Sequence, residues 1–176
     1  MTSFVQKAVF FWDNGTTAIY DRLQVQWADS IDGPWGSAAK GARTYVTEGA
    51  GGGGTSGFSP EDPFVWKDNK GRFHMLINSN SGHHNCAAKV PCGGHLWSED
   101  GLEWSKPHTP AFGTIVHQAD GTTNVYDYCE RPQIAQRPDG TPLAFYFGHG
   151  YSKVENVALM FCQDGDEDAD CVTTVQ

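Results

Sequence analysis

Short apolar runs separated by turn-forming residues make up most of this chain, and the clearest example lies between residues 61 and 78. Glu61 and Asp62 precede a proline and an apolar run, a turn ends at Gly71, and a second apolar run follows. Strand-forming residues on both sides of a glycine-containing turn are typical of a β-hairpin. We therefore predict a hairpin whose first strand is entered through two carboxylates.

The same pattern returns further along the chain. Glu130 and Arg131 precede a proline and a short run over residues 133–136, and the next turn ends at Gly140, 69 residues after Gly71. Repetition at a fixed interval is the sequence signature of architectures built from like units. We interpret the two stretches as equivalent hairpins in successive units.

Three such units account for most of the chain, and they predict an all-β fold. We expect them at about residues 1–48, 61–106 and 130–176, with a Gly-rich connection over 49–60. Units of four short antiparallel strands at this repeat length are typical of β-propeller blades. Known propellers have four or more blades, so we interpret residues 1–176 as a single partial propeller domain, a piece of a larger propeller.

The charge of the chain narrows the classes of partner. The net charge is −9, and Lys and Arg are scattered rather than gathered in the basic stripe that nucleic-acid binding requires. No apolar run approaches the roughly 20 residues of a membrane helix. We therefore predict that the chain binds neither nucleic acid nor a membrane. The same features suit a neutral, hydroxyl-rich ligand such as a sugar.

Five cysteines offer two short-range pairings, Cys86 with Cys92 and Cys162 with Cys171, and leave Cys129 over. The alternative is five free thiols in a reducing compartment. Although the N-terminal residues do not read as a signal peptide, we expect an extracellular or secretory location.

One further set of residues suits zinc by type, namely His83, Cys86, Cys92 and His95. The central gap is short for a usual zinc finger. We predict no metal and no cofactor, and keep a zinc-stabilised β-module as a minor alternative. The tryptophans Trp66, Trp97 and Trp104 are expected in the cores of the blades rather than on a sugar-binding surface.

Both hairpin motifs, together with Gly94-His95, resemble the five-bladed propellers of the arabinanase, levansucrase and invertase superfamily over about residues 9–176. That resemblance implies three acids around the propeller axis. Asp62 matches the acid of the Asp-Pro motif, which orients the substrate, and Glu130 matches the general acid two residues before a proline. The first-blade acid has no counterpart in residues 4–8, so it either lies upstream of Met1 or is missing.

The resulting expectation is a glycoside hydrolase-like protein with Asp62 and Glu130 as catalytic residues. We expect the sugar to be bound by Glu61, Arg131, His95 and Tyr128. Because side chains alternate along a strand, one of the neighbours Glu130 and Arg131 should face away from the site. The alternative is a non-catalytic carbohydrate-binding or scaffold propeller that lacks the first-blade base.

Overall fold

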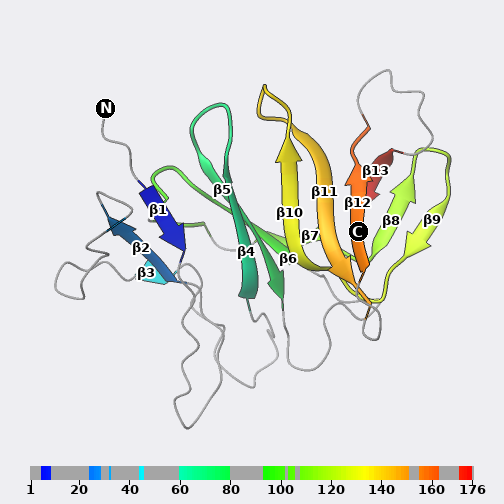
Figure 1. Ribbon diagram of the computed structural model, residues 1–176, viewed down its shortest axis with the longest axis horizontal. Helices are drawn as coiled ribbons and strands as arrows, with labels where there is room; N and C mark the ends of the chain where they lie inside the picture. The colour runs from blue at the N-terminus through cyan, green and yellow to red at the C-terminus, as the bar shows by residue number, and fades with distance from the viewer. Residues whose placement is uncertain are drawn as a thin grey trace, which may run out of the picture.

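The computed structural model (Figure 1) describes residues 5–8, 24–28, 32, 44–45, 60–79, 93–101, 103–105, 108–150, 155–162 and 171–175. Within these ranges the chain forms thirteen β-strands and no helix. The described residues therefore contain no helix that is long and apolar enough to span a membrane. The strands are β1 (Val5–Ala8), β2 (Gln24–Ala28), β3 (Thr44–Tyr45), β4 (Pro60–Lys67), β5 (Phe73–Ser79), β6 (Gly93–Ser98), β7 (His108–Phe112), β8 (Ile115–Gln118), β9 (Thr123–Val125), β10 (Glu130–Gln136), β11 (Pro142–His149), β12 (Glu155–Met160) and β13 (Val172–Val175).

The strands form four antiparallel sheets, which confirms the predicted all-β class. Their strand orders are β1-β2-β3, β4-β5-β6-β7, β10-β11-β12 and β13-β8-β9. Figure 1 shows β10 beside β4, with the β4–β5 and β10–β11 hairpin tips at the same end, and the two strands are in contact. The described residues form no closed ring of sheets.

Three hairpins share one turn design. In each five-residue turn the first residue's N–H donates to the carbonyl of the fifth, and the N–H of the fourth residue, a glycine, donates to the carbonyl of the first. The glycines have φ of 86°, 85° and 83°, a region that residues with a Cβ enter only at a cost. They are Gly71, Gly121 and Gly140. The first and third hairpins were predicted; the second, over residues 118–122, carries the same Asp-Gly dipeptide as the third, in a segment expected to lie between units.

The two predicted hairpins touch at their tips. The Asn69 Nδ2 donates to the Asp139 carbonyl at 3.0 Å, and the Gln136 Nε2 donates to the Lys67 carbonyl at 3.4 Å. Gln136 and Lys67 are 69 residues apart, so the interval read from the sequence reappears as a contact between neighbouring strands. The two hairpins that the pattern predicted therefore lie side by side.

A shared apolar core joins three of the sheets. Phe112 of β7 lies with its ring centroid 5.2 Å from that of Phe145 of β11, and Tyr126 meets Phe147 edge-on at 5.0 Å. Val116 of β8 is buried in the same cluster. Burial of such aromatic rings is a main source of free energy for a sheet-on-sheet contact.

The unit boundaries differ from those expected. The second sheet continues through β7 to Phe112, beyond residue 106, and β8 and β9 form a further hairpin before β10. The last strand, β13, pairs with β8 instead of becoming a fourth strand beside β12. Residues 9–23 of the first expected unit and most of the Gly-rich connection lie outside the described residues.

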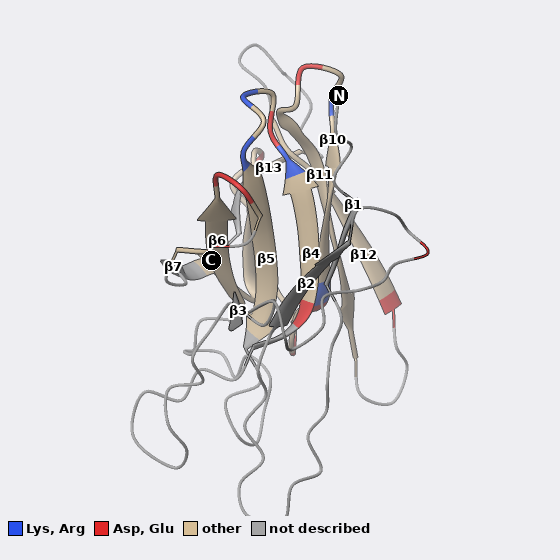
Figure 2. Cartoon of the chain, turned by 90° about the vertical axis from the view of Figure 1, so that its left-hand side faces the viewer, with Lys and Arg blue, Asp and Glu red and all other residues tan. Residues whose placement is uncertain are grey.

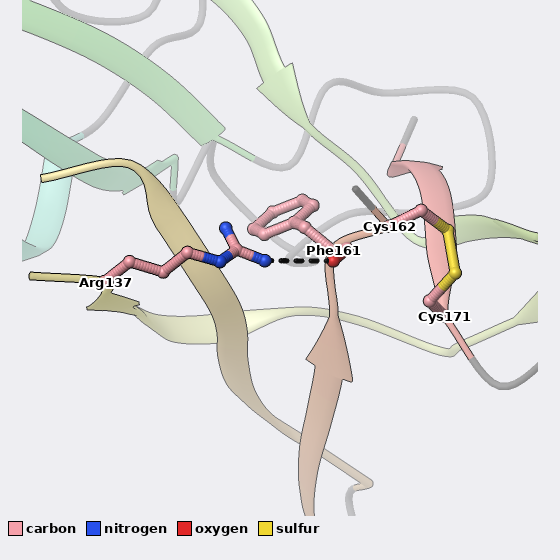
Figure 3. The surroundings of a disulfide bond; sticks show 4 residues. All are labelled: Arg137, Phe161, Cys162 and Cys171. Carbon is pink, nitrogen blue, oxygen red and sulfur yellow. Dashed lines mark hydrogen bonds between the residues drawn. A yellow bond between two sulfur atoms is a disulfide. The ribbon is translucent and has the colours of Figure 1, made fainter. Parts of the chain in front are cut away.

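A disulfide explains how β13 is held in place. Cys162 and Cys171 are bonded, with Cα atoms 5.0 Å apart, as one of the two predicted pairings requires (Figure 3). The carbonyl of Cys171 accepts a hydrogen bond from Ala119 at the end of β8, at 3.0 Å. Near the same junction, the Arg137 guanidinium donates to the carbonyl of Phe161 at 3.4 Å. The disulfide therefore joins the sheet that ends in β12 to the sheet that contains β13.

Candidate functional site

Both Glu-X-Pro motifs form β-bulges at the start of a strand. The register of the β4–β5 pair shifts between Glu61 and Phe64, and that of the β10–β11 pair shifts between Glu130 and Gln133. A bulge bends the strand and re-aims the side chains that it carries. The same device therefore occurs at the same place in both repeats.

Each bulge holds its central residue in a strained conformation. Asp62 has φ of 49° and Arg131 has φ of 53°, and among the described residues these two are the non-glycine residues with positive φ. A proline follows each of them, and a residue before proline normally prefers an extended backbone. Such conformations cost about 1–3 kcal/mol and gather at functional sites. This strain is the clearest sign of function among the described residues.

The bulges change how neighbouring side chains point. Strict alternation predicted that Glu130 and Arg131 face opposite sides. Instead the Arg131 Nη1 lies 3.6 Å from the Glu130 Oε2, so the two side chains meet. The expectation does not hold because positive φ at Arg131 interrupts the pleat on which alternation depends.

The two bulges lie at one end of the molecule. Since β4 and β10 lie side by side with their tips together, both strands begin at the opposite end, where Figure 2 shows acidic residues at the start of β4. The 69-residue interval makes Arg131 the counterpart of Asp62. The Asp62 side chain is partly buried, the Glu130 side chain is 20% exposed and the Arg131 side chain is 68% exposed. Of these three side chains, that of Arg131 is therefore the most exposed to solvent.

Two other predicted sugar-binding residues have different surroundings. Tyr128 is buried in the shared core, and its hydroxyl donates to the carbonyl of Gly150. Its ring supports the segment leading into β10. The strand position of Glu61 is described, opposite Asn78, but its side chain is not.

His95 belongs to a chain of polar groups that leads towards the β4–β5 hairpin tip. Its Nε2 lies 2.9 Å from the Nδ1 of His74, so one ring donates to the other. The Nε2 of His74 lies 3.2 Å from the Oδ2 of Asp68. Trp66 stacks on His74 with ring centroids 5.1 Å apart. The side chain of His95 therefore contacts His74. This chain of contacts runs towards the hairpin tip and away from the bulges.

Asp68 anchors this chain electrostatically. Partial burial opposes its ionisation, but hydrogen bonds from the backbone and guanidinium of Arg72, from His74 and from the backbone of Lys70 outweigh that effect. The pKa of Asp68 is therefore held well below its ordinary value. An ionised Asp68 fixes both Arg72 and His74.

Sequence reasoning did not select Asp68 or His74, and it placed Trp97 in the core. Asp68 occupies the first position of a turn, where aspartate is common for structural reasons alone. His74 and Trp97 are direct partners on adjacent strands, and the sequence does not reveal this pairing. The sequence signal that bears on these residues is the alternation of side chains along each strand, which predicts that His74 and Leu76 lie on the same face of β5.

No three histidine, cysteine or acidic side chains within the described ranges are grouped so as to hold a metal ion. His83, Cys86 and Cys92 lie outside those ranges, so the zinc alternative is untested. Comparison with known proteins found no matching family model, no matching curated protein and no matching solved structure.

Proposed function

We propose that this chain forms part of a carbohydrate-active β-propeller of the glycoside hydrolase type. Asp62 orients the sugar and Glu130 donates a proton to the glycosidic oxygen. The observation that supports this most directly is the pair of strained bulges, which present Asp62 and Glu130 at the same end of two adjacent strands. Strain retained at equivalent positions in two repeats indicates a function that offsets its cost.

The propeller arrangement is supported by the relation between the two units. Strands β4 and β10 are the first strands of their sheets, run in the same direction and are in contact. In a propeller the first strand of each blade lines the axis, and the residues entering it surround one mouth. Asp62 and Glu130 occupy that position in their respective strands.

The chemistry of glycosidic cleavage needs two acidic groups in different roles. One delivers a proton to the leaving oxygen, and another stabilises or attacks the anomeric carbon or activates water there. Glu130 is paired with Arg131 at 3.6 Å. For Glu130 to act as the donor, the guanidinium must swing away, which its 68% exposure allows. Arg131 then becomes a hydrogen-bond donor to the sugar. No residue of this chain is assigned the role of base.

A second function, carbohydrate binding without cleavage, is favoured by the same ion pair. A carboxylate engaged with a neighbouring guanidinium is well suited to hold hydroxyl groups in a fixed orientation. In that case Asp62, Glu130 and Arg131 form a polar sugar-binding site, and hydrolysis is absent.

The test is hydrolysis of a panel of aryl glycosides and polysaccharides by the full-length protein and by Glu130→Gln. We expect the substitution to lower kcat/KM by about 10²–10⁴-fold, the usual contribution of a general acid. Glu99→Gln, an exposed acid in the turn after β6, is the matched control and should leave the rate unchanged.

The outcomes separate the two functions. Unchanged turnover in Glu130→Gln rules out its role as proton donor. Binding of a polysaccharide by the wild type without hydrolysis, weakened in Glu130→Gln, supports the binding function instead. Absence of both activities contradicts both functions.

We also propose an extracellular or secretory location, because the Cys162–Cys171 disulfide is typical of proteins that fold in oxidising compartments.

A further inference from the structure

Strand β12 ends the third sheet at a point where the second sheet continues. The second sheet has a further strand, β7, beside β6, whereas the order of the third sheet is β10-β11-β12. Strand β13 reaches this part of the chain beyond the end of β12, at the bridge between Phe161 and Val172. Among the described strands, none therefore pairs with the outer edge of β12.

The hydrogen-bond pattern shows which backbone groups lie at this edge. The N–H of Phe161 donates to the carbonyl of Leu143 at 3.0 Å, and the β11–β12 register continues from there without a shift. Hydrogen-bonded and non-hydrogen-bonded pairs alternate in an antiparallel ladder, so every second residue of β12 directs its N–H and C=O away from β11. These residues are Asn156, Ala158 and Met160.

The edge of β12 lacks the usual protection against pairing with another chain. Edge strands are commonly blunted by proline, by lysine or by a bulge. The six residues of β12 include neither proline nor lysine, they pair with β11 without a bulge, and their one charge, Glu155, stands at the beginning. On the face that carries Ala158, Tyr146 is 40% exposed and Met160 is 45% exposed. A regular, nearly uncharged edge of this kind is a template for a further strand.

We propose that β12 pairs with β12 of a second copy of this chain, antiparallel and about a two-fold axis at Ala158. Residues that direct their backbone groups outward must face one another across the new pair. The register that uses all three of them sets Ala158 opposite Ala158 of the partner subunit, and Asn156 opposite Met160 of the partner subunit. Each copy contributes a three-stranded sheet, so the pair forms one continuous sheet of six strands.

The occupant is a second copy because the edge is complementary to itself. In this register the Glu155 carboxylates of the two copies lie at opposite ends of the pair. Two molecules of net charge −9 therefore meet along a stretch in which no like charges stand opposite one another. A two-fold pair also uses the same edge on both copies, and so it closes the assembly and leaves this edge unavailable for further growth.

Sedimentation velocity of the full-length protein tests the pairing from about 1 to 200 μM, since so small an interface is expected to have a micromolar Kd. We expect a reversible monomer–dimer equilibrium. Ala158→Lys sets two ammonium groups opposite each other at the axis and should raise the Kd of the dimer about fivefold or more. Ala158→Glu should do the same, and a mixture of the two variants should dimerise again, because lysine then faces glutamate.

A second variant tests the backbone contact. Ala158→Pro removes the N–H that each copy donates at the axis and leaves the hydrogen bonds to β11 in place. It should raise the Kd of the dimer about tenfold or more, the effect of losing two hydrogen bonds. The matched control is Val125→Lys, which places a lysine at a 64% exposed position of the edge strand β9 and should dimerise as the wild type does.

Several results would overturn the proposal: a wild type that stays monomeric over the whole range, dimerisation unaffected in Ala158→Lys, equal loss in Val125→Lys, or a charge-swapped mixture that does not associate. Thermal unfolding shows whether each variant is folded, and Ala158→Lys serves if Ala158→Pro is not. Hydrogen exchange gives an independent readout, because the amides of Ala158 and Met160 should become more protected as the protein concentration rises. Protection of these amides that does not depend on concentration would mean that another part of the same molecule covers β12.

Discussion

At the scale of single residues, the backbone of Arg131 stores strain that its side chain does not relieve. Its φ of 53° places Cβ close to the following carbonyl, and its ion pair with Glu130 joins a guanidinium that is 68% exposed to a carboxylate that is 20% exposed. Left-handed backbone costs a non-glycine residue about 1–2 kcal/mol, whereas an ion pair whose cation lies in solvent typically contributes about 1 kcal/mol or less. Stability alone would therefore favour glycine at this position.

We accordingly predict that Arg131→Gly raises the free energy of unfolding by up to about 1 kcal/mol, because glycine enters this region without steric cost. Arg131→Ala is the control. It removes the same guanidinium but keeps Cβ, and so should give no gain. Urea denaturation of both variants measures the difference, and equal stabilities would contradict the assignment of strain to this residue.

At the scale of elements, the β4–β5 and β10–β11 hairpins were predictable, and the pairing of β13 was not. Turn chemistry and the 69-residue interval depend on residues close in sequence, and they located both hairpins. The pairing of β13 with β8 brings Val172 opposite Gln118, more than 50 residues away. Short strands carry little information about such distant partners, because many segments offer the same alternation.

The candidate site was predictable to the same extent. The Glu-X-Pro motifs pointed to Asp62 and Glu130, and both lie at strand-initial bulges. The bulge itself was not predicted, and because the ion pair between Arg131 and Glu130 depends on the bulge, that contact was not predicted either. His95 was selected for the glycines before it, but its contact with His74 depends on the register of β5 and β6, which the sequence does not specify.

The contact between hairpin tips can be tested with two glycines. Gly140 and Gly121 have nearly equal φ, 83° and 85°, but a Cβ on Gly140 would lie 3.1 Å from the backbone N of Asn69, whereas a Cβ on Gly121 meets nothing within 4 Å. We expect Gly121→Ala to cost about 1–2 kcal/mol from left-handed strain alone. Gly140→Ala should cost about 1–3 kcal/mol more, because the neighbouring tip must shift.

Urea denaturation of the two alanine variants gives this difference directly. Equal destabilisation would show that the tips do not press on one another in solution. In that case the contact between Asn69 and Asp139 would contribute little to the packing of β4 against β10.

At the scale of the whole molecule, the sheets are joined by contacts of different kinds. The second and third sheets share an aromatic core and touch at their hairpin tips. The third sheet and the β13-β8-β9 sheet share the same core and are also linked covalently by Cys162–Cys171. The remaining described cysteine, Cys129, is buried and not disulfide-bonded; its thiol donates to the Gly113 carbonyl, and burial raises its pKa to about 12. It is therefore a poor partner for disulfide exchange.

We predict that the double substitution Cys162→Ser and Cys171→Ser lowers the free energy of unfolding by about 2–3 kcal/mol, the chain-entropy effect of opening so short a loop. For a chain of this size that corresponds to a fall in Tm of roughly 4–12 °C, measurable by calorimetry. Hydrogen exchange should also accelerate at Val116 and Gln118, whose strand pairs with β13, while the amides of β5 at Met75 and Ile77 change only with the global stability. Uniform acceleration throughout the described strands would mean that the disulfide stabilises the fold as a whole and does not specifically hold β13 against β8.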